Sequence, residues 1–185
     1  MKKIIFFLLT ISALKSFGQA SIIDFGNLDE KNKAWVILSD NVMGGITTST
    51  IEYTTDAVVL TGDISLANYG GFSSIKTKFK SFDLSIYNGI KIKFKSSNQK
   101  FIFTLEDSKY WTEPYYKNGF SSTKNDTWEE AIIYFKDFKE MRIGQATGNA
   151  MPLENLKNIV RLGIMTAEKK EGPFSLEVDY IEFIK

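Results

Sequence analysis

Apolar and polar residues alternate with a period of two along much of the chain. At residues 89–96 isoleucine or phenylalanine occupies every second position and lysine fills most of the others, a pattern typical of a half-buried strand. The lysine row is expected to face solvent and to discourage pairing at a sheet edge. Residues 101–105 repeat the alternation after a Ser-Asn turn signal at 97–98, so the two segments are predicted to form a hairpin.

The same alternation recurs in other short segments, whereas helical periodicity is scarce. Turns of helix are expected only at 136–141 and, after Pro152, at 153–157. About ten short strands separated by turn residues predict an all-β fold in which two sheets pack as a sandwich. The remaining predicted strands are 22–25, 49–53, 58–61, 75–79, 128–135, 160–165 and 174–179.

The first 18 residues have the features of a secretory signal peptide. Two lysines precede a mostly apolar run at 4–14, and small residues stand at positions 16 and 18, where a signal peptidase reads the chain. The apolar run is shorter than the ~20 residues of a membrane-spanning helix. We therefore expect cleavage after Gly18 and export to the periplasm or the medium. The processed chain, residues 19–185, is expected to form one domain that does not span a membrane.

Charge argues against a nucleic-acid partner. The whole chain has a formal net charge of +1, and the signal peptide contains three lysines and no acid, so the processed chain is slightly acidic. A nearly neutral protein lacks the positive surface that attracts a phosphate backbone. Only two of the 23 basic residues are arginine, the side chain best suited to gripping phosphate.

Composition also removes many catalytic chemistries. The chain contains neither histidine nor cysteine, which excludes histidine-based triads, cysteine nucleophiles, the usual zinc sites and iron–sulfur clusters. No phosphate-binding or dinucleotide motif is present. We therefore expect no cofactor, no metal and no enzyme activity. The weaker alternative is a glycan-active enzyme that uses Glu106, Asp107 or Glu113 as its acids.

Two Gly-Gly pairs follow Asn-containing turns. Gly44 and Gly45 come after Asp40 and Asn41, and a second pair, Gly70 and Gly71, comes after Asn68. Glycine pairs indicate tightly bent backbone. If the two turns converge, the carboxylate and the two amides have the chemistry to hold calcium or a sugar hydroxyl. The alternative, which we favour, is that they bond to their own loop backbone and fix the turns. Met43 is expected to fill space in the core.

Aromatic residues form a second candidate site. Tyr110 and Trp111 are adjacent, as are Tyr115 and Tyr116, and Trp128 follows. Neighbours in a strand face opposite sides, so at least one ring of each pair is expected on the outer face. Such a patch can stack on sugar rings or contact a protein, because tyrosine and tryptophan suit both kinds of interface. Packing within the core is the remaining alternative.

Several ordered blocks resemble the complex I intermediate-associated protein family. They are Trp35 with the Ser-Asp-Asn-Val-Met-Gly-Gly run at 39–45, the Leu-x-Gly-x-Ile-Ser-Leu-x-Asn-x-Gly-Gly-Phe run at 60–72, the Leu-Gly-Ile-Met run at 162–165, and 172–181. The resemblance spans residues 22–184. It implies a galactose-binding-like jelly-roll sandwich and a role like that of the family's NADH:ubiquinone oxidoreductase assembly factors.

Three functions follow from these patterns. The first is a non-catalytic, exported binding or assembly domain that holds a protein partner through its loops and aromatic patch. The second is a secreted carbohydrate-binding module that uses the same patch. The third is the enzyme described above. Candidate contact residues for a protein or glycan are Asp40, Asn41, Asn68, Trp111, Tyr115 and Tyr116.

Overall fold

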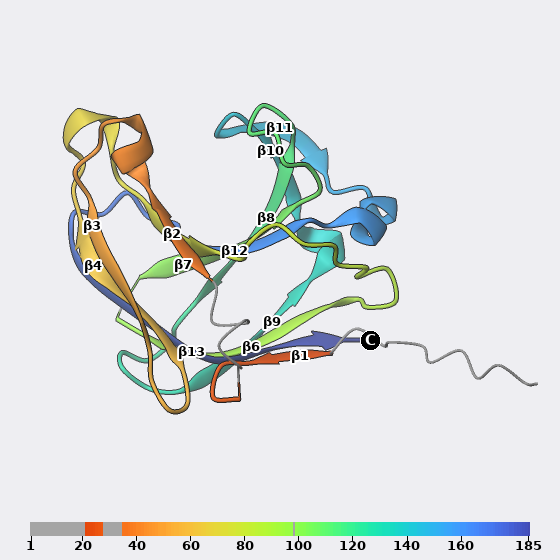
Figure 1. Cartoon of the computed structure of the whole chain (residues 1–185), viewed down its shortest axis with the longest axis horizontal. Helices are drawn as coiled ribbons and strands as arrows, with labels where there is room; N and C mark the ends of the chain where they lie inside the picture. The colour runs from red at the N-terminus through yellow and green to blue at the C-terminus, as the bar shows by residue number, and fades with distance from the viewer. Residues whose placement is uncertain (1–20, 28–34, 98) are drawn as a thin grey trace, which may run out of the picture.

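Two antiparallel sheets face each other in a computed structural model that describes residues 21–27, 35–97 and 99–185 (Figure 1). One sheet has six strands in the order β3-β4-β13-β6-β9, with β1 paired to β13. Its strands are β1 (Ile22–Asp24), β3 (Thr48–Tyr53), β4 (Val58–Ile64), β6 (Gly89–Ser96), β9 (Glu129–Tyr134) and β13 (Gly172–Ile184). This is the two-sheet sandwich that the alternation predicts.

The other sheet has seven strands in the order β11-β10-β8-β7-β12-β5-β2. Four short 3-10 turns, η1 (Asp40–Met43), η2 (Ala67–Tyr69), η3 (Phe135–Asp137) and η4 (Leu153–Asn158), connect strands of the sandwich. No helix in the described part of the chain is long and apolar enough to cross a membrane. The strands of the seven-stranded sheet are β2 (Val36–Ser39), β5 (Ser73–Lys76), β7 (Lys100–Glu106), β8 (Tyr115–Ser121), β10 (Lys139–Arg142), β11 (Gln145–Ala150) and β12 (Arg161–Thr166).

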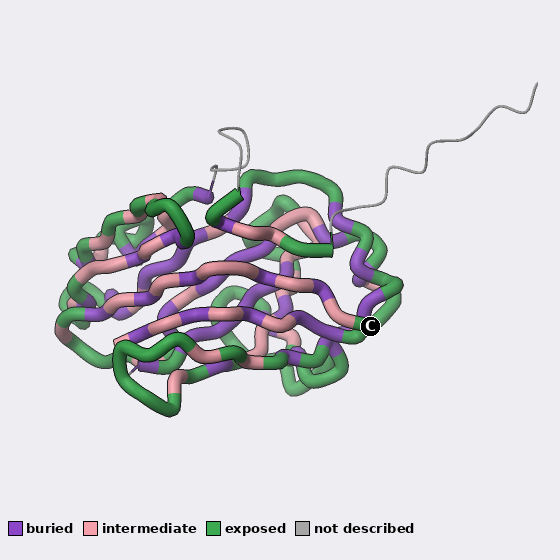
Figure 2. Tube along the Cα trace, turned by 90° about the horizontal axis from the view of Figure 1, so that it is seen from below, coloured by how far each residue is buried: buried purple, intermediate pink, exposed green. Residues whose placement is uncertain are grey.

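The core lies between the sheets, where alternate residues of each strand meet. From the six-stranded sheet, Ile92 and Leu176 are fully buried, and from the seven-stranded sheet so are Phe103 and Ile164. Figure 2 shows the resulting alternation of buried and partly exposed positions along neighbouring strands. The residues that alternate with these buried positions in the seven-stranded sheet therefore lie on its outer face.

The predicted hairpin of residues 89–96 and 101–105 is wrong. β6 pairs with β13 and β9 in one sheet, whereas β7 pairs with β8 and β12 in the other. The chain crosses from sheet to sheet between them. A short turn signal is compatible with either path, and the crossing lets the apolar faces of both strands bury against each other across the sandwich.

The lysine row of β6 does not protect a sheet edge, because β6 lies between β13 and β9. Its lysines instead pair with acids of β13 on the outer face. Lys91 lies 2.6 Å from Glu182, and Lys95 lies 2.8 Å from Glu177. Opposite charges on neighbouring strands stabilise the pairing modestly.

Other local predictions are corrected by long-range pairing. The helical turn expected at 136–141 is limited to η3, and β10 follows directly. The turn expected at 153–157 is present as η4. The predicted strand at 75–79 ends at Lys76, which leaves Phe79 in an exposed segment. β8 and β11 are not predicted by alternation, since glycine and polar residues interrupt the pattern.

Candidate functional site

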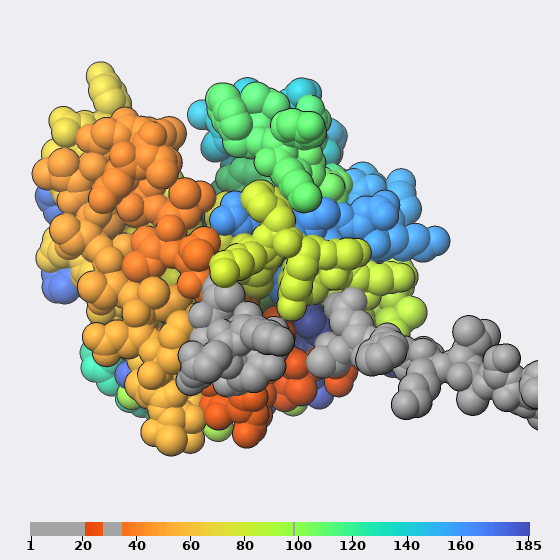
Figure 3. Space-filling model, in the orientation of Figure 1, coloured from red at the N-terminus to blue at the C-terminus, as the bar shows by residue number. Residues whose placement is uncertain are grey.

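The outer face of the seven-stranded sheet is hollowed into a groove. Figure 3 shows the hollow between the segment around residues 36–50, in orange, and the segment around residue 110, in green. Strand register places the side chains on its floor: Arg161 of β12 lies opposite Glu106 of β7, which lies opposite Tyr115 of β8. Leu38 of β2 and Lys76 of β5 extend the lining toward the sheet edge.

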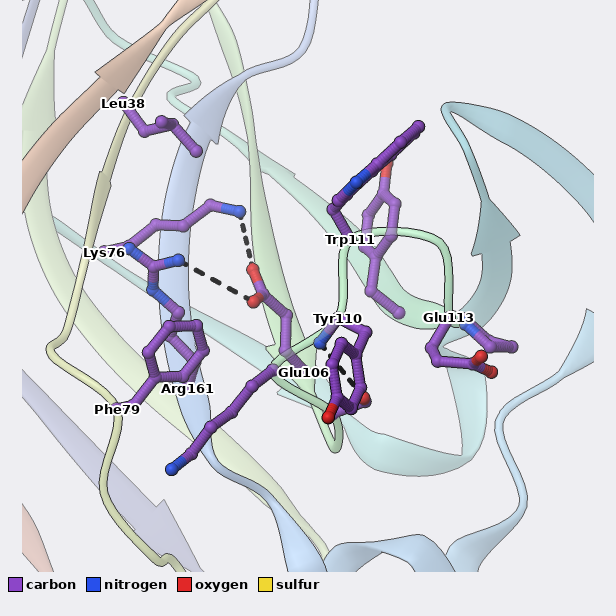
Figure 4. Close-up of a pocket in the computed structure, with 12 residues that line it drawn as sticks. Leu38, Lys76, Phe79, Glu106, Tyr110, Trp111, Glu113 and Arg161 are labelled. Atoms are coloured by element: carbon purple, nitrogen blue, oxygen red, sulfur yellow. Dashed lines mark hydrogen bonds and ion pairs between the residues drawn. The ribbon is translucent and has the colours of Figure 1, made fainter. Parts of the chain in front are cut away.

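The pocket in this groove has a volume of about 190 Å³. A single water molecule needs only about 10–15 Å³ by the same kind of measure, so the pocket admits part of an organic ligand. Its lining combines aromatic, aliphatic and charged side chains, as ligand sites commonly do. The lining residues are drawn in Figure 4.

A charged cluster occupies the floor of the pocket. The Lys76 ammonium lies 2.5 Å from one carboxylate oxygen of Glu106, and an Arg161 guanidinium nitrogen lies 3.9 Å from the other (Figure 4). Arg161 also donates to the carbonyl oxygen of Thr77, at 3.0 Å, and stacks on the Phe79 ring, 4.5 Å from its centroid. These contacts hold the three charged groups in a fixed geometry, with only 15–16% of each side chain exposed.

Gly163 leaves room for the Lys76 side chain on the floor of the pocket. A Cβ atom added to Gly163 would lie 3.0 Å from Cγ of Lys76 and 2.5 Å from the hydroxyl of Thr104. The distance to the hydroxyl is too short for a real side chain, and the distance to Lys76 would require the lysine to shift. Gly163 therefore lets the Lys76 chain lie close to the sheet, with its ammonium on Glu106.

Exposed aromatic rings stand across the pocket from this cluster. Tyr110 and Trp111 lie in the loop between β7 and β8, with 76% and 79% of their surfaces exposed. Figure 4 shows the Trp111 ring standing above the pocket opposite Lys76 and Glu106. Tyr115 also lines the pocket and is half-buried, and burial, followed by the nearby Glu106 charge, raises the pKa of its phenol.

Strand parity separates the rings of one aromatic pair and not those of the other. Tyr115 and Tyr116 are neighbours in β8 and face opposite sides, so Tyr116 is buried and is not part of the exposed patch. Its hydroxyl bonds to Asp107 and Asn155, and burial raises its pKa to about 12. Tyr110 and Trp111 are both exposed because they lie in a loop.

Trp128 lies apart from the groove. It immediately precedes β9 of the six-stranded sheet, where it covers the lysines of β6, with Lys95 5.5 Å from its ring centroid. It is therefore not a member of the groove patch.

The Gly-Gly turns converge, and Asp40 joins them. The buried carboxylate of Asp40 accepts bonds from the backbone N–H groups of Gly71 and Phe72, at 2.6 and 3.2 Å, and from the N–H and hydroxyl of Thr47, at 3.1 and 2.5 Å. Burial by itself raises the pKa of this carboxyl, but the hydrogen bonds outweigh burial and the net pKa is lowered. Its bonding capacity is thus used within the loops.

The two asparagines also bond within the same loops. Asn68 donates from its amide nitrogen to the carbonyl oxygen of Gly44, at 3.1 Å. When the Asn41 amide is oriented so that its nitrogen faces the neighbouring acceptors, it donates to the carbonyl oxygens of Gly45 and Thr47, at 3.2 and 2.9 Å. Met43 is 69% exposed, so the expectation that it fills the core is wrong.

One glycine of each pair has a left-handed backbone, with φ of 89° at Gly44 and 121° at Gly71. A Cβ atom on Gly71 would also lie 2.9 Å from the Leu66 side chain. We expect Gly71→Val to lower the free energy of unfolding by about 1–3 kcal/mol, because a β-branched residue is strained at positive φ. Urea denaturation measures the change.

Gly119→Val is the matched control, because Gly119 lies in β8 at ordinary φ and a Cβ there meets nothing nearer than 3.7 Å. Its unfolding free energy is expected to stay within about 0.5 kcal/mol of wild type. Equal stability of Gly71→Val and wild type would contradict the assigned strain.

The acids considered for catalysis have separate surroundings. Glu106 is held by Lys76 and Arg161, Asp107 bonds to Tyr116 and Asn155, and Glu113 lies in the exposed turn before β8. In residues 21–27, 35–97 and 99–185, no group of three or more acids could hold a metal ion.

Sequence reasoning finds the aromatic wall of the groove but not its charged floor. Lys76 and Arg161 come from strands far apart in sequence, and nothing near either residue indicates that they meet. The available signal is that each is a long charged side chain with outward parity beside a buried apolar residue, Ile75 or Leu162.

Comparisons with known proteins agree with this architecture. A family model described as complex I intermediate-associated protein 30 matches residues 23–178. Among curated proteins, none matches the sequence significantly.

Solved structures with the same fold include carbohydrate-binding modules. The family 11 module of a cellulosomal cellulase from Clostridium thermocellum aligns with a TM-score of 0.63 and 16% identity, over 89% of this chain and 94% of the module. The same module in complex with a β-1,3-1,4-mixed-linked tetrasaccharide aligns with 0.63 and 17% identity, over 89% and 95%. An agarase aligns with 0.54 and 8% identity, over 90% of this chain and 25% of the enzyme. At these identities the likeness establishes the fold alone.

Proposed function

The chain belongs to the complex I intermediate-associated protein 30 family, and we propose that it is a non-catalytic binding domain whose groove holds a carbohydrate chain. The observation that carries the proposal is the pairing of the exposed Trp111 ring with the Lys76–Glu106–Arg161 cluster in one pocket.

The two halves of the pocket match the two kinds of surface that a sugar presents. The rings of Trp111 and Tyr110 offer flat apolar faces for the C–H face of a pyranose. The charged cluster offers donors and acceptors for hydroxyl groups, and hydrogen bonds to charged groups are stronger than neutral ones. Since the cluster is already held in place, little side-chain entropy is lost on binding.

The fold supports the same proposal. The similar module from Clostridium thermocellum has been solved with a bound tetrasaccharide. A mixed-linked β-glucan oligosaccharide is therefore the first probe, followed by an array of plant and algal glycans.

Titration of the wild-type protein, observed by tryptophan fluorescence, tests the proposal. We expect a saturable change with at least one oligosaccharide, because Trp111 stands at the pocket. No saturable change with any glycan of the array would contradict carbohydrate binding.

A protein partner is the second candidate, and the family match favours it. The matching family is described by its association with complex I intermediates. An assembly role predicts that immobilised protein captures a defined partner and that excess oligosaccharide does not release it. Release by oligosaccharide instead favours the glycan.

Export remains part of the proposal. The apolar run at 4–14 and the small residues before position 19 lie outside the described residues. N-terminal sequencing of protein recovered from the periplasm or medium is expected to begin at Gln19, within a residue. Protein that retains Met1 in the membrane fraction would contradict cleavage.

A further inference from the structure

The loops that contain the two Gly-Gly pairs form one rigid projection, which we call the paired-loop tip: residues 41–46 and 65–71. Figure 1 shows η1 and η2 beside each other at one end of the sandwich, and Figure 3 shows their atoms in contact. Asp40 ties the first loop to the backbone of Gly71, and Asn68 ties the second loop to Gly44.

The paired-loop tip is apolar and exposed. Tyr69 is 99% exposed, and other large apolar side chains of both loops are also exposed. Those side chains are Val42, Met43, Ile46 and Leu66. No charged residue occurs at 41–51 or at 64–75. Single exposed apolar residues are ordinary, but a charge-free group on one projection indicates a contact surface.

The backbone at the tip is held in an uncommon conformation. Asn68 and Tyr69 are consecutive residues with φ of 54° and 61°. Such residues are strained and persist only where the surroundings enforce them, most often at functional sites. At Tyr69 the result is a ring that stands clear of its own protein.

We propose that the paired-loop tip inserts shallowly into the surface of a lipid bilayer. Tyrosine suits the headgroup level, where one end of its ring is apolar and the other hydrated. Met43, Val42 and Leu66 supply apolar side chains for the acyl boundary, and no charge has to be desolvated.

Many backbone polar groups of the tip are already hydrogen-bonded and do not need water, which favours a lipid surface as the partner. Entry into a bilayer is costly for backbone groups without partners. Here the N–H groups of Gly44, Gly45 and Gly70 bond within their own turns, and the Asn68 amide caps the carbonyl of Gly44. The tip therefore presents side chains to a lipid surface with much of its backbone already satisfied.

Electrostatics make the attraction independent of lipid charge. The Asp40 carboxylate beside the tip is buried and bonded within the loops. A charged segment that approaches the tip from outside is 168–171, Glu-Lys-Lys-Glu, which has no net charge. Lys169 approaches the tip, since its Cγ lies 3.4 Å from the position of a Cβ on Gly71. We therefore expect binding to zwitterionic vesicles, changed little by anionic lipid or by salt.

Flotation with phosphatidylcholine vesicles tests the proposal. Chains that begin at Gln19 are used, because the apolar run at 4–14 partitions by itself and every described strand lies after it. The wild type is expected to float with the vesicles. Met43→Ser with Tyr69→Ser should weaken partition at least ~tenfold, from the apolar area lost.

Ile132→Ser with Tyr134→Ser is the matched control, because both residues are exposed in β9, at the edge of the six-stranded sheet opposite to β3. It is expected to float like the wild type. Failure of the wild type to float, or equal loss in both variants, would overturn the proposal, as would binding that requires anionic lipid. If melting shows that the tip variant unfolds, Val42→Ser with Ile46→Ser replaces it under the same criteria.

Discussion

Replacing Asp40 with alanine is expected to lower the free energy of unfolding by about 3–5 kcal/mol, the largest effect of any single change outside the apolar core. The carboxylate is fully buried and accepts bonds from Thr47, Gly71 and Phe72. Alanine leaves the backbone N–H groups of these three residues without an acceptor, and each unpaired buried group costs about 1–3 kcal/mol. Urea denaturation followed by circular dichroism measures the loss.

Asp63→Ala is the control, because Asp63 is an exposed acid in the adjoining strand β4. It should change stability by no more than about 0.5 kcal/mol. A similar small change for Asp40→Ala would show that the loops do not depend on this carboxylate.

The same residue predicts a pH dependence. Because the folded pKa of Asp40 is lowered, its carboxylate stabilises the fold above its unfolded pKa, near about 4. That contribution is lost as pH falls through the folded value. The stability difference between wild type and Asp40→Asn should therefore be constant above about pH 5 and shrink below about pH 4. A difference that does not change with pH would contradict the lowered pKa.

Replacing Trp111 and Tyr115 together with alanine is expected to weaken ligand binding at least about thirtyfold while the fold is retained. Trp111 is mostly exposed and Tyr115 half-buried, so neither is a principal core residue. An aromatic residue at the centre of an interface commonly contributes about 2 kcal/mol or more. Calorimetry with the oligosaccharide or protein found for the wild type measures the loss.

Trp128→Ala provides the matched control, because Trp128 lies on the other sheet, over the lysines of β6. It should bind the ligand as the wild type does. If the double variant unfolds, the residues are structural. If it folds and binds normally, the site lies outside the groove, and the loops around Asp40 and Asn68 are the next to test.

The candidate site was predictable only in part: the sequence indicates Tyr115 but not Lys76. Tyr115 and Tyr116 are adjacent, so strand parity predicts that one faces outward, and β8 turns Tyr115 to the groove. Lys76 becomes a groove residue only because β5, β12 and β7 are neighbours and Glu106 lies within 2.5 Å. Parity says which side of its own strand a residue occupies, and it does not say which strand comes next.

The sequence by itself determines the all-β class, most of the strands and the family, because these depend on alternation and on ordered local blocks. It also indicates the two Gly-Gly turns, where left-handed backbone is needed. Only the tertiary structure decides that β6 and β7 belong to different sheets, that Asp40 links loops 31 residues apart at Gly71, and that Met43 is exposed. Those outcomes depend on pairing between distant segments, whose free energy comes from the whole buried core rather than from neighbouring residues.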